Sequence, residues 1–108
     1  MYIIITPQQF LRQARKFFKK HPDLKARFAA VVTDLQKGPF QPGLALHPLS
    51  GKLSGCHAVN LTYSYRITLT ILVTDKEIIL LDIGSRDEVH RKVSGRNLLR
   101  KPRTQKDG

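Results

Sequence analysis

The stretch from His57 to Val73 alternates between apolar and polar side chains, and this alternation constrains the fold more than any other feature. Successive side chains of a strand point to opposite faces, so the pattern predicts a sheet with one buried and one open face. Hairpin turns are expected near Thr62–Ser64 and at Thr74-Asp75-Lys76. The sequence EIILLDI (77–83) follows as a strand that is apolar on both faces and therefore central.

The N-terminal part predicts a short strand at Tyr2–Ile5 and then two helices. Thr6 as N-cap, Pro7 at the first helical position and Gln9 completing a capping box predict the first helix. Its apolar residues recur at helical spacing: Phe10, Leu11, Ala14, Phe17 and Phe18. The second helix is expected to begin at Pro22 and to stop at Gly38-Pro39. Its apolar face comprises Leu24, Phe28, Val31, Val32 and Leu35.

The predicted order is β-α-α-β-β-β followed by a short helix or tail. It indicates an α+β domain, with the helical hairpin packed on one face of a small, mainly antiparallel sheet. The Gly- and Pro-rich segment 38–55 is long for a structureless connection, which favours a functional loop or one wrapped along an edge. The 108 residues suit a single domain. We assign residues 1–93 to this domain and 94–108 to a basic, flexible tail.

The formal charge of +11 is unevenly distributed along the chain. Residues 7–37 carry eight basic and two acidic side chains, and residues 94–108 carry five basic and one acidic. This distribution suits RNA or an acidic protein partner. A membrane surface is disfavoured, because no helix combines this charge with a bulky exposed apolar face. The start MYIIITPQQ resembles neither a signal peptide nor a membrane span, so a cytoplasmic location is expected.

The stretch IGSRDEVH (83–90) allows two interpretations. A capping box from Ser85 to Glu88, with Asp87 in the first turn, is an ordinary helix start. It leaves Arg86 and His90 unexplained, and in a helix these two lie at i and i+4 on one face. An arginine and a histidine together can hold a phosphate and move a proton near neutral pH, so the stretch also fits the rim of an active site.

Arg66 lies on the polar face of a predicted inner strand, where a guanidinium needs a carboxylate, solvent or a ligand phosphate. A structural salt bridge to Asp82 and a phosphate contact are equally compatible with the sequence.

Neither a metal nor a cofactor is expected. None of the four histidines has a histidine partner at metal-ligand spacing, and the Cys56-His57 pair alone is a weak signal. No Gly-rich phosphate loop or nucleophile elbow is present.

Three segments resemble the RelE/ParE toxin superfamily, nearest its RelE/YafQ-type messenger-RNA interferases. HPLSGKLSG (47–55) is similar to the family's H-x-L-x-G-x-L-x-G loop, and YSYRI (63–67) to the following D-Y-R-[IV] strand. LLDIGSRDEVHR (80–91) is similar to the terminal D-I-G-[TS]-H-D-E-V-Y block. With the predicted order of elements, the resemblance covers roughly residues 1–91.

The resemblance implies a metal-independent endoribonuclease toxin of a type II toxin–antitoxin system. Relatives cradle mRNA on the open sheet face in the ribosomal A site, where the 2′-OH attacks the adjacent phosphate. The implied partners are the ribosome, mRNA and a cognate acidic antitoxin. The implied catalytic residues are Arg66, Arg86 and His90, of which His90 falls at the family's terminal tyrosine. The implied RNA-binding residues are His47, Lys52, His57, Asp87, Arg91 and Lys92.

The chain also departs from the family pattern. Gly84-Ser85-Arg86 stands where many relatives read G-T-H, and Ser64 stands where an aspartate precedes the Y-R pair. The alternatives are a ParE-like toxin that inhibits a protein target such as gyrase without catalysis, and an RNA-binding relative that acts through charge alone. Arg66, Arg86 and His90 favour the nuclease, since a pure binder does not need them clustered.

Overall fold

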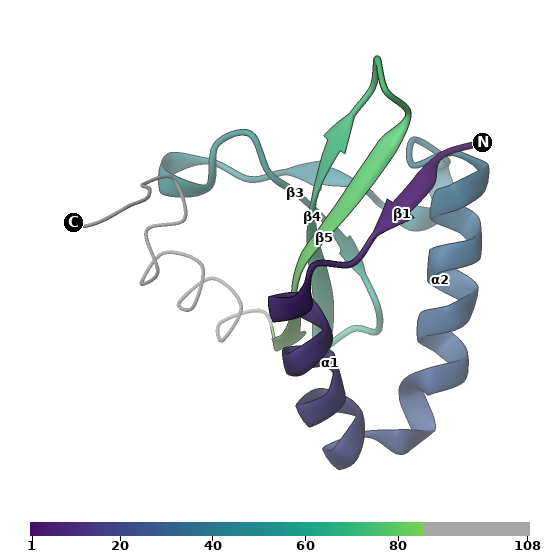
Figure 1. The fold of residues 1–108 in the computed structure, drawn as a ribbon, viewed down its shortest axis with the longest axis vertical. Helices are drawn as coiled ribbons and strands as arrows, with labels where there is room; N and C mark the ends of the chain where they lie inside the picture. The colour runs from purple at the N-terminus through teal and green to yellow at the C-terminus, as the bar shows by residue number, and fades with distance from the viewer. Residues whose placement is uncertain (86–108) are drawn as a thin grey trace.

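The structure is a computed structural model that describes residues 1–85, and within them it confirms the α+β architecture (Figure 1). The helices are α1 (Gln8–Lys20) and α2 (Lys25–Lys37). The strands are β1 (Ile3–Ile5), β2 (His47–Pro48), β3 (His57–Asn60), β4 (Tyr65–Leu72) and β5 (Glu77–Ser85). Short 3₁₀ turns are η1 (Pro22–Leu24), η2 (Pro42–Leu44) and η3 (Gly51–Leu53).

The five described strands form one sheet in the order β1-β5-β4-β3-β2. Only β1 and β5 pair in parallel, and β5 lies between β1 and β4, as its doubly apolar sequence predicted. Both predicted hairpin turns are present. In the first, the Thr62 hydroxyl accepts hydrogen bonds from the backbone N–H groups of Ser64 and Tyr65, at 3.2 and 3.3 Å. The two-residue strand β2 was not predicted, because the segment 38–55 shows no alternation.

One hydrophobic core joins both helices to the same face of the sheet. It takes alternate side chains of the strands, as the period of two requires. Its buried members are Phe10, Ala14, Phe17, Val31, Leu35, Leu44, Val59, Leu61, Ile67, Leu69, Ile78, Leu80 and Ile83.

The predicted start of the first helix is wrong by one residue. Pro7 is the N-cap, with an extended ψ of 156°, and no side chain caps the helix. The Pro7 carbonyl accepts the N–H of Leu11 at 3.0 Å, so Gln8 is the first helical residue. Thr6 therefore precedes the N-cap by one residue and Gln9 is the second helical residue, so the two do not occupy the N-cap and N3 positions of a capping box. Pro22 starts the turn η1, and α2 itself begins at Lys25.

A β-bulge in β5 decides which of its side chains face the helices. Thr68 pairs with Asp82, but the next residue, Leu69, pairs with Leu80, so Leu81 is the extra residue of the bulge. As a result, Leu80 and Ile83 both join the core, although they are three residues apart. Asp82 and Gly84 turn to the opposite face, which they share with Thr68 and Arg66.

We expect Gln13→Ala to lower the free energy of unfolding by about 1–3 kcal/mol, the cost of leaving a buried acceptor unpaired. Gln13 of α1 is buried, and its Nε2 donates a 2.8 Å hydrogen bond to the Ile83 carbonyl of β5. This bond ties the first helix to the last described strand. Chemical denaturation of both proteins measures the difference. Gln8→Ala, an exposed glutamine of the same helix, is the control and should change stability by less than about 0.5 kcal/mol. Equal stability of the Gln13→Ala protein and the native chain would contradict the expectation.

Candidate functional site

The face of the sheet turned away from α1 and α2, hereafter the distal face, brings together residues from separate parts of the chain. In one row across the strands, Arg66 lies between Asn60 and Gly84. In the next, His47, Ala58, Thr68 and Asp82 follow one another across β2, β3, β4 and β5. Adjacent strands are about 4.8 Å apart, so the row from His47 to Asp82 spans roughly 14 Å.

The centre of the distal face is buried, which corrects the prediction of an open face. Arg66 is 4% exposed, and Thr68 and Asp82 are 0% exposed. Towards the rim, Asn60 is exposed and Thr70 half-buried. The alternation of apolar and polar residues identifies the side chains that point away from the core beside the helices. It does not reveal whether those side chains are exposed to solvent.

Arg66 and Asp82 are opposite charges buried on the same face of adjacent strands. Arg66 pairs with Gly84, two residues beyond Asp82, so the two charged residues are diagonal neighbours. The Cβ atoms of such neighbours are about 7–8 Å apart or less, within reach of an arginine side chain. Asp82 Oδ1 also accepts the N–H of Ile83 at 2.9 Å. The other acidic side chain on this face in the described strands, Glu77, lies at the far end of β5.

Because Arg66 and Asp82 are buried, each of the two charges needs a nearby opposite charge to offset its loss of hydration. Removing an isolated charge from water is costly, and an opposite charge in the same low-dielectric region lowers that cost. The placement therefore supports a structural contribution of Arg66 and Asp82, one of the two interpretations that the sequence left open.

His47 lies at the edge of the distal face, on the short strand β2. Its Nδ1 is 3.0 Å from the Ala45 carbonyl oxygen. A carbonyl oxygen can only accept, so Nδ1 donates, and the neutral ring keeps Nε2 as its acceptor. The side chain is half-buried, and it is the one described histidine on the distal face.

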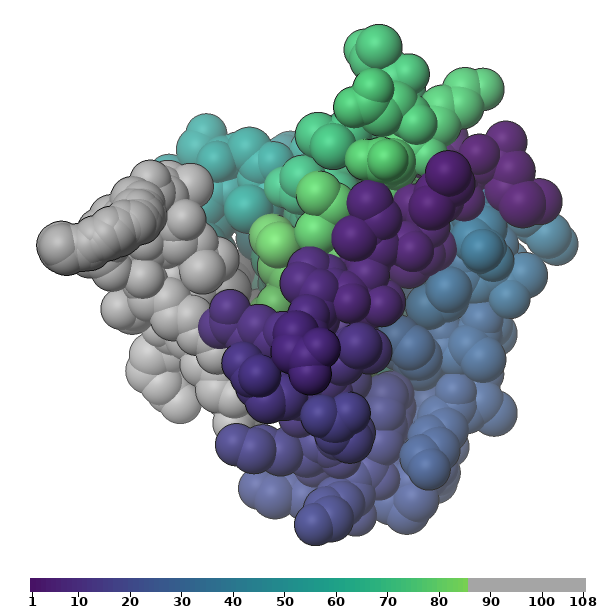
Figure 2. Space-filling model, in the orientation of Figure 1, coloured from purple at the N-terminus to yellow at the C-terminus, as the bar shows by residue number. Residues whose placement is uncertain are grey.

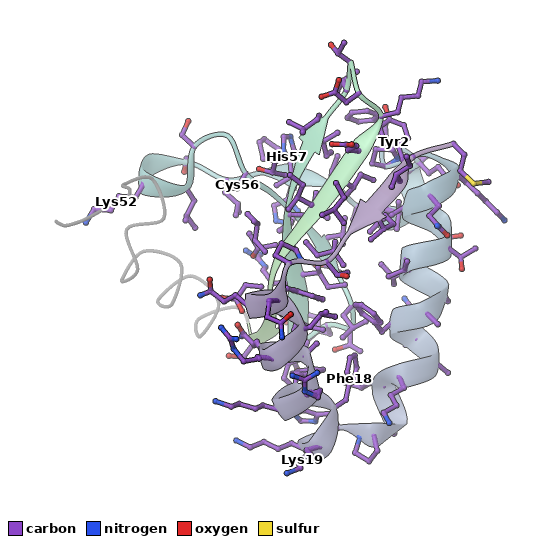
Figure 3. The ribbon with its side chains drawn as sticks, viewed as in Figure 1. Tyr2, Phe18, Lys19, Lys52, Cys56 and His57 are labelled. Carbon is purple, nitrogen blue, oxygen red and sulfur yellow. The ribbon has the colours of Figure 1, made fainter. Side chains whose placement is uncertain are left out.

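The structure separates two predicted RNA-binding residues from this group. His57 pairs with Leu69, a core residue, so it faces the helices, and its Nδ1 is buried without a hydrogen-bond partner. Lys52 is exposed on η3, in the loop that extends away from the sheet (Figure 3). Five further predicted residues lie outside the described part of the chain: Arg86, Asp87, His90, Arg91 and Lys92.

Sequence reasoning did not select Asn60 and Thr68 as site residues. Asn60 lies directly opposite Arg66, and Thr68 lies directly opposite Asp82. In the sequence, both residues lie at polar positions of the alternating stretch. These positions were the signal that could have indicated them. Their positions opposite Arg66 and Asp82 follow only from the strand register, which a single sequence does not specify.

Within residues 1–85, no three or more His, Cys, Asp or Glu side chains gather closely enough to hold a metal ion. In the same region no helix is both long and apolar enough to span a membrane.

Comparison with solved structures identifies the fold. A metal-bound toxin from Helicobacter pylori superposes with a TM-score of 0.68 at 27% identity, covering 82% of this chain and 99% of its own. YafQ from Escherichia coli gives a TM-score of 0.69 at 18% identity, with 82% and 98% covered. The toxin–antitoxin complex RelBE2 from Mycobacterium tuberculosis gives 0.56 at 21% identity, with 79% and 98% covered. No family model and no curated protein sequence matches the chain.

Proposed function

We propose that this chain, which has the fold of the RelE/ParE toxin superfamily, is the toxin of a type II toxin–antitoxin system and that it cleaves mRNA on the ribosome. One observation carries the proposal. Each of the three segments that resemble the family's motifs contributes a residue to the distal face: His47 and Asp82 share one row, and Arg66 lies in the next.

The proposed reaction uses no metal or cofactor. The 2′-OH of one nucleotide attacks the adjacent phosphorus, the new P–O2′ bond forms, and the bond to the 5′-oxygen of the next nucleotide breaks. His90 accepts the proton of the attacking 2′-OH or donates a proton to the leaving 5′-oxygen, because an imidazole changes its charge near neutral pH. Arg66 and Arg86 stabilise the phosphorane, whose negative charge grows in the transition state.

Burial of Arg66 is compatible with this role. A fixed charge interacts more strongly through a low-dielectric region than through water, so a guanidinium beneath the surface of the sheet still attracts a phosphate that lies over it. Arg66 would then stabilise the fold beside Asp82 and would also contribute positive charge that attracts the phosphate.

The proposed RNA-binding residues are His47, Lys52, Asp87, Arg91 and Lys92. His57 is left out because it faces the helices. Asn60 is added because it is exposed and lies directly opposite Arg66. Its amide can donate to phosphate oxygens and hydrogen-bond to base edges.

The proposed partners are an acidic antitoxin, the ribosome and mRNA, and the proposed location is the cytoplasm. RelBE2 is a toxin–antitoxin complex, which supports an antitoxin here. Induced expression of the chain alone should arrest growth, and co-expression of the neighbouring small reading frame should restore it. If no neighbouring product binds the chain or relieves the arrest, the proposal fails.

Deleting residues 95–108 should weaken association with ribosomes and make it less dependent on salt. The deleted segment carries five basic residues and one acidic residue. Each phosphate contact releases counterions, so losing such contacts reduces the slope of log affinity against log salt concentration. Ribosome co-sedimentation at several salt concentrations measures that slope. An unchanged slope in the truncated protein would show that the tail, which lies outside the described residues, does not contact the ribosome.

A further inference from the structure

Tyr63 is the most exposed aromatic residue in the described part of the chain. It is 92% exposed, and it lies in the turn that joins β3 to β4. Figure 1 shows this turn at the lower end of β4. Single exposed apolar residues are common on protein surfaces, so exposure alone does not indicate a binding site. The surroundings of Tyr63 decide whether it can hold a ligand.

The residues on both sides of Tyr63 are fixed to the body of the protein. Leu61 is fully buried in the core, and its N–H donates a 2.9 Å hydrogen bond to the Tyr65 carbonyl. The Tyr65 ring packs edge-on against Phe17 of α1, with ring centroids 5.2 Å apart. The Thr62 hydroxyl closes the turn with its two hydrogen bonds to backbone N–H groups. Because this backbone is already held in place, a ligand that packs on Tyr63 orders little further structure, which lowers the cost of binding.

Groups that bind phosphates and bases lie close to Tyr63. Asn60 and Arg66, which lie opposite each other on the distal face, are each three residues from Tyr63, at most about 11 Å along the backbone. Arg27 of α2 is exposed, and its Nε donates a 3.0 Å hydrogen bond to the Leu61 carbonyl. The guanidinium carries further N–H groups, and phosphate oxygens accept strong hydrogen bonds from such donors. Cationic and amide groups therefore lie near the exposed ring.

The opposite end of β4 has a different charge. The turn from β4 to β5 projects at the top of Figure 2, and it carries Asp75 and Lys76, with Glu77 directly after them. Segment 60–66 contains no acidic residue. An anionic strand that approaches the sheet therefore meets less repulsion at the Tyr63 end.

We infer that Tyr63 is a stacking site for an unpaired base of the RNA. The inference rests on the proposed function, and it adds a contact that acts through the base rather than through the phosphates. Every nucleobase has a flat π face, so an aromatic ring binds it with little regard to sequence. Arg27 and Arg66 attract the phosphates of the same strand, while the Tyr63 ring holds a base beside them.

A protein partner is the less suitable occupant of this turn. The centre of a protein interface is an apolar patch, whereas the immediate neighbours of Tyr63 in the chain are Thr62 and Ser64. An aromatic ring beside cationic groups is the arrangement that single-stranded nucleic acids require.

The affinity test uses the full chain and a labelled single-stranded RNA of about ten nucleotides. Tyr63→Ala should weaken binding at least about fivefold, the low end of the usual effect of removing a base-stacking ring. Tyr63→Phe keeps the π face and removes only the hydroxyl, so its affinity should stay within about twofold of the native value. The matched control is Phe40→Ala, which removes another exposed aromatic ring from the loop after α2 and should also stay within about twofold. Thermal melts confirm that each variant folds.

Three further measurements separate stacking from a phosphate contact. Tyr63→Ala should leave the slope of log affinity against log salt concentration unchanged, because an uncharged ring releases no counterions. An abasic RNA analogue of the same length should bind the native chain and the Tyr63→Ala protein equally. The chain contains no tryptophan, so Tyr63→Trp introduces a single reporter, whose fluorescence should be quenched by the RNA and not by the abasic analogue. Phe40→Trp is the control and should show little change with either ligand.

Several results would overturn the inference. They are equal RNA affinities of the Tyr63→Ala and native chains, an equally large loss in Phe40→Ala, and no binding of the RNA by the native chain at low salt. If Tyr63→Ala weakens binding of the neighbouring antitoxin but not of RNA, Tyr63 belongs to a protein interface and the inference is wrong.

The failure of this inference is distinguishable from failure of the proposed function. If Tyr63→Ala binds RNA as the native chain does, while expression of the native chain still cleaves messages, the stacking site is wrong and the proposed function stands. If the native chain cleaves no message but its RNA affinity still falls in Tyr63→Ala, the proposed function fails and the stacking site stands.

Discussion

Arg66→Ala will lower the free energy of unfolding by about 3–5 kcal/mol, the usual cost of leaving a buried opposite charge without its compensation. Arg66 is 4% exposed and Asp82 is 0% exposed, and they are diagonal neighbours on the distal face. Removing the guanidinium leaves the Asp82 carboxylate buried beside a new cavity. Chemical denaturation of the native and variant chains measures the loss.

A double-mutant cycle isolates the coupling of the two residues. The cycle compares Arg66→Ala and Asp82→Ala with the variant that carries both changes, and we expect a coupling energy above about 1 kcal/mol. Lys52→Ala, which removes an exposed basic side chain, is the matched control and should change stability by less than about 0.5 kcal/mol. If the Arg66→Ala protein is as stable as the control, Arg66 does not contribute to stability, and a purely ligand-binding role remains.

His90→Gln will cut ribosome-dependent mRNA cleavage by about a hundredfold or more while leaving stability and antitoxin binding intact. The reason is that glutamine can hydrogen-bond to the reacting groups but cannot transfer a proton near neutral pH, and general acid–base catalysis is worth about 10²–10⁴-fold. Cleavage of a defined message on purified ribosomes, assayed well below the melting temperature of each variant, measures the rate.

His57→Gln is the matched control, since His57 faces the helices. It should leave the cleavage rate unchanged. Full toxicity of the His90→Gln protein would exclude His90 as the proton-transfer residue. His47, the described histidine of the distal face, would then become the first candidate.

Much of the fold was predictable because hydrophobic spacing reports which side chains share a face. The alternation after His57 and the apolar segment 77–83 predicted two adjacent hairpin-linked strands and a central strand, all of which the structure contains. The details depend on tertiary context. Pro7 became an N-cap rather than the first helical residue, and the pairing of β2 is set by its neighbour β3.

The candidate site was less predictable, because register decides which residues meet. The β-bulge at Leu81 turns Asp82 towards Thr68 and Arg66, and nothing in the local sequence indicates the extra residue. His57 and His47 looked equivalent in the sequence, yet pairing with Leu69 places His57 on the helix side. The roles of Arg86 and His90 remain predictions from the sequence, since both lie outside the described residues.

Mapping the 5′ ends of cellular messages after induced expression tests directly whether the chain cleaves mRNA. Primer extension or ribosome profiling should reveal new ends within translated regions, in frame with codons, in cells that express the native chain. The same ends should be absent with the His90→Gln protein. Growth arrest with an SOS response and no new message ends would contradict mRNA cleavage, and it would indicate a non-catalytic toxin that acts on a protein target such as gyrase.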